Sequence, residues 1–344
     1  MDSQVIRVGI VGAGHNTRLK HIPQLRQVAN VEIVSVCNTS RQSSERVAAD
    51  LHISKIYDHW QALVEADDTD AILIGTWPYL HGDITLAALA ADKHVLCEAR
   101  MAADVEQARQ MLKAAQAKPH LVTQLVPSPM TLEFDETIKK LIREGFLGEV
   151  LVIELRAEGS FIDPTEQMHW RHNYALSGYN TMSLGIWYEA IMRWVGTAGK
   201  VTAMSKTFVR ERTNAHGEKC QVKIPDHLDV IADMVCGAQM HMQISAVTGF
   251  SDGPKVYLFG SEGTLCLAGT TLLGGRRPDK ALARISIDPA LRGRWRVEAE
   301  FINAIRGREQ VKLTTFEDGV KYMEFTAAVV RSAQTDKSIS LQEV

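Results

Sequence analysis

Short apolar runs alternate with amphipathic stretches over the first 125 residues. Continuously apolar runs, typical of strands buried on both faces, occupy 5–12, 31–37, 70–75, 93–97 and 119–124. Stretches with helical spacing lie between and after them, at 17–29, 41–51, 59–66, 80–91 and 103–117. Asp58 is expected to cap the third of these helices. The alternation predicts an α/β fold with a doubly wound parallel sheet, whose ligand lies at the carboxyl ends of the strands.

The pattern changes in the rest of the chain. Strand-like runs occupy 150–156, 228–237, 240–248, 254–260, 263–268 and 338–341. Helical stretches occupy 131–145, 179–194, 294–306 and 316–334. Because 344 residues are long for a single core, we expect two domains, a first at 1–125 and a second α/β domain at 126–344.

The first strand ends in a glycine-rich turn that opens into a helix. Gly12 permits a tight turn, and Gly14 lets backbone N–H groups approach a pyrophosphate. Thr17 replaces the third glycine of the usual fingerprint. The turn predicts a dinucleotide site that includes Gly12, Gly14, His15, Asn16 and Thr17. The alternative is a tight turn that binds nothing.

The second strand ends without the acidic residue that usually holds the ribose 2′-hydroxyl of NAD. Asn38, Ser40 and Arg41 offer hydrogen-bond donors and a positive charge instead, which suit a 2′-phosphate. These residues favour NADP over NAD as the cofactor. The alternative is that Arg41 is a solvated residue of a first helical turn.

Two further strand ends carry candidate site residues. Thr76, Trp77 and His81 follow the run at 70–75 and are expected to bind the cofactor, with Trp77 beside its ring system. Glu98 and Arg100 follow the run at 93–97 and would lie at the same cleft. The alternatives are a helix residue with satisfied hydrogen bonds for His81 and a surface ion pair for Glu98 and Arg100.

The second half contains a cluster of polar and aromatic residues. Trp170 and Arg171, with His172 beside them, are of the kinds that stack on sugar rings and bond hydroxyls or carboxylates. His169 and His172 have a spacing that permits a metal, but no clear third and fourth ligands follow. We therefore expect no metal, and exposed loop histidines instead.

The stretch at 179–194 is predicted to be a helix that crosses the cleft. On helical spacing Asn180, Ser183 and Trp187 share one face, and we expect them to bind substrate. Tyr179 lies nearer another face. Glu189 and Arg193 are expected to form an ion pair one turn apart.

Composition narrows the class of partner. A formal net charge of −3 gives no reason to expect nucleic acid or an anionic membrane. No apolar run has the length of a membrane span, and the N-terminus lacks the form of a signal peptide. The five cysteines lack CxxC spacing and indicate a reducing compartment, by default the cytoplasm.

Taken in order, these landmarks resemble the Gfo/Idh/MocA family, the glucose-fructose oxidoreductase and inositol dehydrogenase group. Besides the glycine-rich turn, the segments that carry the resemblance are 76–81, 94–98, 145–150, 260–265 and 301–306. The resemblance implies a Rossmann domain followed by an α/β domain with a large, mostly antiparallel open sheet. It implies NAD(H) or NADP(H), a sugar, sugar acid or cyclitol as substrate, and a homodimer or homotetramer formed through that sheet.

Three usual catalytic side chains of that family are missing here. The family's Glu-Lys-Pro becomes Glu98-Ala99-Arg100, so the lysine is absent. Ser183 stands at the usual aspartate and Trp187 at the usual histidine. Three losses in a preserved frame indicate altered chemistry, or a site that binds without the usual hydride transfer.

The leading hypothesis is an NAD(P)-dependent oxidoreductase with an atypical catalytic site. Arg100 would polarise a carbonyl or hold a carboxylate, because a guanidinium stays protonated. Glu98, His81, His172 or Tyr179 would then carry the proton. The alternatives are a redox-assisted lyase or epimerase, and a non-catalytic protein that binds NAD(P) or a sugar.

Overall fold

The computed structural model describes residues 4–344 and divides the chain into two compact units. The first unit contains the described residues up to Pro127 together with Arg296–Met323. The second contains Ser128–Trp295 and Glu324–Val344. Nothing in the sequence pattern indicates that a segment near residue 300 returns to the first unit.

The first unit is built on a six-stranded parallel sheet. In order across the sheet the strands are β3 (Lys55–Ile56), β2 (Val31–Cys37), β1 (Ile6–Val11), β4 (Ala71–Ile74), β5 (His94–Cys97) and β6 (Thr123–Leu125). Val11 pairs with Cys37 on one side and Ile74 on the other, so three central strands end side by side. The predicted doubly wound sheet is confirmed, although the two-residue strand β3 was not predicted.

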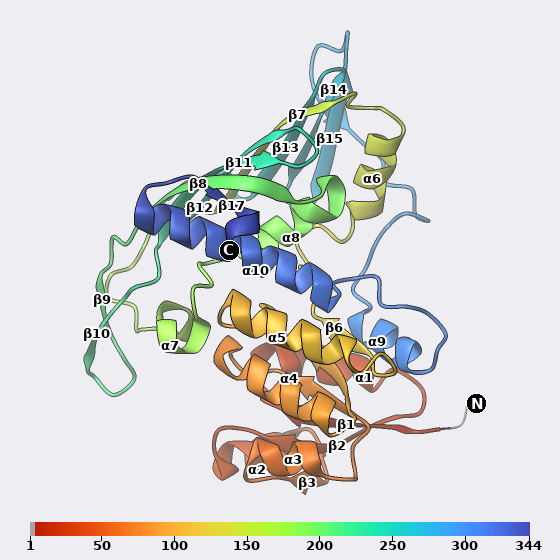
Figure 1. The fold of residues 1–344 in the computed structure, drawn as a ribbon. Coiled ribbons are helices and arrows are strands. Elements are labelled where there is room, and N and C mark those ends of the chain that lie inside the picture. Colours follow the sequence, from red (N-terminus) through yellow and green to blue (C-terminus); the bar gives the residue numbers. More distant parts are fainter. Residues whose placement is uncertain (1–3) are drawn as a thin grey trace. The chain divides into compact units, whose positions relative to one another are not determined.

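Helices connect these strands (Figure 1). They are η1 (Thr17–His21), α1 (Ile22–Leu25), α2 (Arg41–Asp50), α3 (Trp60–Glu65), η2 (Pro78–Leu80), α4 (His81–Ala90) and α5 (Val105–Gln116), and the returning segment adds α9 (Val297–Ile305) to the unit. The single helix expected at 17–29 is instead one turn of π-helix, η1, followed by the short α1. Helix α4 packs beside α5, and α1 packs beside α9. The returning segment thus covers the helix that follows the first strand.

The second unit contains a nine-stranded mixed sheet. In order its strands are β16 (Ala283–Arg284), β15 (Thr271–Arg276), β14 (Gly263–Ala268), β13 (Lys255–Gly260), β7 (Val150–Glu158), β12 (Gln239–Ser245), β11 (His227–Met234), β8 (Ala198–Lys206) and β17 (Ile339–Ser340). A separate hairpin joins β9 (Glu211–Thr213) and β10 (Lys219–Gln221). Within residues 4–344 the large sheet is antiparallel except between β7 and β12, which confirms the predicted, mostly antiparallel sheet.

The second unit also contains helices. The helices of the unit are α6 (Asp135–Arg143), η3 (Trp170–His172), α7 (Tyr174–Ser177), α8 (Leu184–Val195), the second part of α10 (Phe316–Thr335) and η4 (Leu341–Glu343). Tyr188 of α8 and Phe325 of α10 are fully buried and stack with ring centroids 3.6 Å apart. Ser332 of α10 accepts a hydrogen bond from the N–H of Ala203 in β8. These contacts hold α8 and α10 together and anchor α10 to the sheet.

The helix predicted at 179–194 begins only at Leu184. Gly178 has φ +62° and ends α7, and Met182 has φ +43° just before α8. Backbone of this kind interrupts a right-handed helix, so Tyr179 and Asn180 lie in a connecting turn. The shared helical face expected for Asn180, Ser183 and Trp187 is therefore wrong.

The large sheet also has a face with exposed apolar residues. On β11 the buried residues alternate with less buried ones, among them Ile231, which is 50% exposed. Met204 of β8 pairs with Asp229, two residues before Ile231, and so points to the same face, where it is 76% exposed. Among the helices formed by residues 4–344, none has both the length and the apolar character needed to cross a membrane.

Candidate functional site

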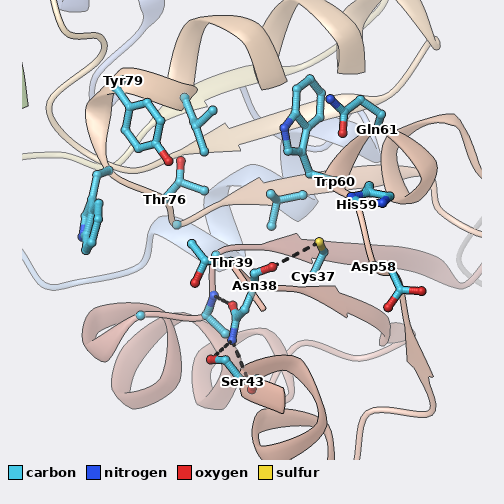
Figure 2. Close-up of a pocket in the computed structure, with 17 residues that line it drawn as sticks. Cys37, Asn38, Thr39, Ser43, Asp58, His59, Trp60, Gln61, Thr76 and Tyr79 are labelled. Carbon is cyan, nitrogen blue, oxygen red and sulfur yellow. Dashed lines mark hydrogen bonds between the residues drawn. The ribbon is translucent and has the colours of Figure 1, made fainter. Parts of the chain in front are cut away.

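A pocket of about 690 Å³ opens where β1, β2 and β4 end (Figure 2). This is the edge at which a doubly wound sheet binds its ligand. The residues that line it are Val11, Gly12, Ala13, Gly14, Cys37, Asn38, Thr39, Ser43, Asp58, His59, Trp60, Gln61, Gly75, Thr76, Trp77, Tyr79 and Leu80. All of them belong to the first unit.

The glycine-rich turn presses against the backbone that follows β4. Gly12 has φ +87°, and a Cβ atom there would lie only 2.6 Å from the backbone nitrogen of Thr76 and 2.7 Å from the carbonyl carbon of Gly75. Its own N–H donates to the carbonyl of Cys37 at 2.8 Å. Thr17, at the place of the third glycine, donates from Oγ1 to the carbonyl of Gly12 at 3.2 Å. Thr17, in the first turn of η1, therefore stabilises the glycine-rich turn through this hydrogen bond.

Asn38 links the end of β2 to the same turn. Its Oδ1 accepts a hydrogen bond from the N–H of Ala13 at 2.7 Å, and its Nδ2 donates to Oγ of Ser43 at 3.1 Å (Figure 2). The side chain thus shapes the pocket wall through internal bonds. Ser40 caps α2 by accepting a hydrogen bond from the N–H of Ser43.

Arg41 is exposed and is paired with two carboxylates. Its Nε lies 3.0 Å from Glu45, and its terminal nitrogen lies 2.8 Å from Asp58. Asp58 itself lines the pocket, and it does not cap α3, since His59 occupies the N-cap position. The predicted capping role of Asp58 is wrong, and the group of three side chains carries a net charge of −1 where a phosphate-binding site was expected.

Thr76 and Trp77, which are predicted to bind the cofactor, line the pocket, whereas His81 is not among its lining residues. The imidazole of His81 is fully buried, with Nδ1 2.9 Å from the carbonyl oxygen of Arg100 and Nε2 3.0 Å from that of Thr76. Burial lowers the pKa of His81 against the effect of these bonds. The side chain joins the ends of β4 and β5.

Glu98 takes part in a buried network rather than a surface ion pair. Its Oε1 lies 2.9 Å from Nε2 of His21 and also accepts a hydrogen bond from Asn16. Nδ1 of His21 lies 2.5 Å from Oε1 of Glu298 in α9. Arg100 is buried as well, with 3% of its surface exposed, so the surface ion pair considered from the sequence is wrong.

The charges in this network shift two pKa values. Burial lowers the pKa of His21, but the hydrogen bonds and charges of Glu298 and Glu98 outweigh it and raise the pKa to about 9. Burial raises the pKa of Glu98, but the hydrogen bond and charge of His21 outweigh it and hold the pKa below its usual value. Glu98 is therefore a stable carboxylate near neutral pH.

In the second unit, two histidines brace the turn that carries Trp170 and Arg171. Nδ1 of His169 accepts from the N–H of Arg171 at 3.3 Å, and Nδ1 of His172 accepts from the N–H of His169 at 3.2 Å. Burial and nearby positive charge lower both pKa values. A neutral imidazole with an accepting Nδ1 carries its proton on Nε2. The guanidinium of Arg171 lies 4.3 Å over the ring of Trp170.

A hairpin that the sequence analysis missed holds the segment leading into this turn. Arg212 of β9 is buried and donates from one nitrogen to the carbonyls of Asp163 and Glu166, both at 2.9 Å. The N–H of Met168 donates to the carbonyl of Thr213 at 2.8 Å. The run of alternating residues around Arg212 is too short to signal a strand on its own.

The remaining predicted substrate residues are mostly buried. Asn180 donates to the carbonyl of Ser177 at 2.6 Å, and Ser183 and Trp187 are 7% and 5% exposed. Tyr179 is 39% exposed and packs against Tyr174, with ring centroids 4.6 Å apart. The expected ion pair between Glu189 and Arg193 is confirmed, with a separation of 3.3 Å.

Five of the twelve residues predicted to bind the cofactor line this pocket. Those that line it are Gly12, Gly14, Asn38, Thr76 and Trp77. Seven others are not among its lining residues: His15, Asn16, Thr17, Ser40, Arg41, His81 and Glu98. Four residues after β3, from Asp58 to Gln61, were missed because β3 was not recognised. When a strand is not predicted, the loop at its carboxyl end is not considered as part of the binding site.

Individual proteins resemble this chain over different lengths. Inositol 2-dehydrogenase of Pseudomonas fluorescens (strain SBW25) is 29% identical over 153 residues, 43% of this chain and 44% of that protein, so the chain matches less than half of it. Glucose-fructose oxidoreductase domain-containing protein 1 of Mus musculus is 24% identical over 95% of this chain and 90% of its own. The crystal structure of an NAD binding oxidoreductase from Klebsiella pneumoniae has a TM-score of 0.83 at 22% identity, covering 98% and 99% of the two chains. Levoglucosan dehydrogenase in complex with NADH and L-sorbose has a TM-score of 0.84 at 20% identity, covering 98% of both.

The family comparison covers both units. Residues 6–125 match the oxidoreductase family with an NAD-binding Rossmann fold. Residues 136–266 match the GFO/IDH/MocA C-terminal domain. With these two matches over more than half of its length, the chain belongs to the Gfo/Idh/MocA family of oxidoreductases.

Proposed function

We propose that this protein is an NAD(H)-dependent oxidoreductase that acts on a sugar, sugar acid or cyclitol. The observation that carries the proposal is the pocket at the ends of β1, β2 and β4, with Gly12 packed against the backbone of Thr76. A bound nicotinamide cofactor supplies hydride transfer, while the protein supplies binding and orientation. In the wall of this pocket, Asn38 fixes the glycine-rich turn, and Trp77 offers an exposed ring for stacking.

The substrate class rests on the second unit and on relatives. Trp170 and Arg171 offer a flat apolar ring with a cation, and His172 offers an Nε2–H donor beside them. Such groups bind the faces and hydroxyls of sugars. Relatives and structural neighbours include an inositol dehydrogenase and a levoglucosan dehydrogenase, which supports a polyhydroxylated substrate. The cytoplasmic location expected from the cysteines stays a prediction.

Tyr179 is the proton-carrying group we favour. Glu98 is held as a carboxylate by His21, and both ring nitrogens of His81 bond backbone carbonyls. His172 accepts at Nδ1 from a backbone N–H, which favours its neutral form and suits it to hydrogen bonding rather than to proton uptake. Arg100 cannot release a proton at neutral pH. Tyr179 remains, with an exposed side chain.

The first test is cofactor binding and turnover. Titration of purified protein should show quenching or enhancement of NADH fluorescence, and Gly12→Ala should abolish it, because its Cβ would collide with backbone at Thr76. A polyol or sugar from a broad panel, added with NAD+, should then raise the absorbance of reduced nicotinamide, and a keto sugar added with NADH should lower it. Binding without any absorbance change across the panel supports the non-catalytic alternative instead, and the absence of binding refutes the cofactor site.

The second test concerns the choice between NAD(H) and NADP(H). The sequence favours NADP(H), but the net charge of Arg41, Glu45 and Asp58 opposes a 2′-phosphate, so we expect tighter binding of NAD(H). Asp58→Asn should raise the affinity for NADPH relative to NADH by about five- to tenfold, because removing one nearby unit charge is worth roughly 1 kcal/mol in a solvated site.

Asp50→Asn is the matched control, since Asp50 pairs with Arg18 at the other end of α2. It should leave the ratio of the two affinities unchanged. Tighter binding of NADPH by the unmodified protein, weakened by Arg41→Ala, contradicts our choice and restores the expectation from the sequence.

The third test addresses Tyr179. Tyr179→Phe should lower kcat by at least about 100-fold, the usual contribution of general acid–base catalysis, while NADH binding stays unchanged. Tyr174→Phe removes a hydroxyl from the neighbouring ring and should retain most of the activity. Equal losses in the two variants would mean that the aromatic pair has a packing role only.

The fourth test concerns assembly. We propose that a second copy of the chain covers the face of the large sheet that exposes Met204 and Ile231, giving a homodimer or homotetramer. Ile231→Asp, between Asp229 and Asp233, should lower the mass measured by light scattering. Leu19→Asp, an equally charged change at an exposed position of the first unit, should not. A monomeric unmodified protein rules the assembly out.

A further inference from the structure

Three side chains from three parts of the first unit contact one another close to the glycine-rich turn. His21 ends η1, Glu98 follows β5, and Glu298 lies in α9. The imidazole is fully buried, Glu298 has 1% of its side chain exposed, and Glu98 has 14%. Nε2 of His21 is 2.9 Å from Glu98 and Nδ1 is 2.5 Å from Glu298. The two carboxylates therefore face opposite edges of one ring.

With both carboxyl groups ionised, the geometry requires a protonated ring. A neutral imidazole has one N–H donor and one acceptor, so it can donate to only one of two carboxylates. The imidazolium has two donors and satisfies both. The carboxyl groups are also the charged groups that raise the pKa of His21 to about 9. Glu98, His21 and Glu298 together then form a buried unit in which one cation joins two anions, which we call the carboxylate clamp.

The clamp is tied to the cofactor pocket by two short routes. Asn16, two residues after Gly14, donates to the same Oε1 of Glu98 that faces His21. The N–H of Glu98 donates to the carbonyl of Ile74 at 2.9 Å, and the next two residues, Gly75 and Thr76, line the pocket. If Glu98 moved, the positions of the glycine-rich turn and of the end of β4 would both change, because each is hydrogen-bonded to it.

We propose that His21 is a positioning residue whose imidazolium clamps Glu98 to Glu298 and so holds the glycine-rich turn in the arrangement that binds the dinucleotide. The residue does not touch the pocket and acts through Glu98 and Asn16. The proposal rests on the proposed function in so far as the ligand is a nicotinamide dinucleotide. It adds a carboxylate from α9, beyond residue 295, to the groups that control the pocket.

The clamp predicts a specific dependence on pH. The pKa of His21 is raised on folding, so its contribution is complete below its usual pKa near 6.5 and is lost as the pH rises through about 9. Loss of the proton leaves two buried carboxylates facing a ring with one donor, and they repel each other. Binding that needs the closed clamp should then weaken about tenfold for each pH unit above the pKa.

Glu298→Gln is the diagnostic variant. It keeps the size of the side chain but removes one of the two charges that hold the proton on His21, so the pKa of His21 should fall. Glu300→Gln is the matched control, because Glu300 is a buried carboxylate of the same helix that bonds Gln124 and the N–H of Lys312 instead. Its substitution tests the packing of α9 without changing the clamp.

The measurement is the dissociation constant of NADH, from fluorescence titration between about pH 6 and pH 10, with circular dichroism at each pH. For the unmodified protein we expect constant affinity at the lower end and a loss with a midpoint near 9, while the circular dichroism stays native. In Glu298→Gln the midpoint should move down by at least about one pH unit. In Glu300→Gln it should not move.

Two results overturn the proposal. One is an affinity of the unmodified protein for NADH that stays constant up to the highest pH measured. This result does not depend on the folding of any variant. The other is a uniform weakening in Glu298→Gln with an unchanged midpoint, the mark of a merely structural role. If the proposed function is wrong, the result is different: NADH binds at no pH. The proposed role of the clamp in cofactor binding is then refuted as well.

Discussion

The direct contact between the backbone of the glycine-rich turn and the backbone after β4 is the constraint on which the first unit depends. No side chain fits between Gly12 and the backbone of Gly75 and Thr76, and Gly75 is equally crowded from the other side by Gly12 and Thr17. The strands β1 and β4 can therefore end side by side, and the pocket opens directly above the contact. Asn38, Thr17 and the carboxylate clamp all act to keep this turn in place.

Local sequence signals were sufficient for much of the fold. Buried parallel strands have continuous apolar runs, so β1, β2, β4 and β5 were recognised, whereas the two residues of β3 carry no such run. The helix at 179–194 was placed too early because hydrophobic spacing does not report the positive φ angles of Gly178 and Met182. An aspartate that precedes a helix has the sequence signature of an N-cap, whatever its side chain contacts. The sequence therefore predicts a capping role for Asp58, whereas the side chain pairs with Arg41 and lines the pocket.

The candidate site was predictable where it is local and not where it joins distant parts of the chain. Gly12, Asn38 and Thr76 follow strand ends, and the parallel order of the strands brings them together. The partners of His21, in contrast, lie 77 and 277 residues further along the chain. No periodicity or spacing connects such positions. A buried histidine bonded to two acids looks the same in the sequence as a solvated one.

Because Arg296–Met323 returns to the first unit, the segments that form this unit are not translated one directly after the other. A ribosome translates β1 to β6 before the strands of the large sheet, so these six strands are available for pairing first. Glu298 is translated only after the strands of the large sheet up to β16. Until then His21 has one carboxylate partner of its two, and the nascent pocket lacks the support of α9. The strands of the dinucleotide unit are therefore translated before the large sheet, yet the unit is complete only after β16 has been made.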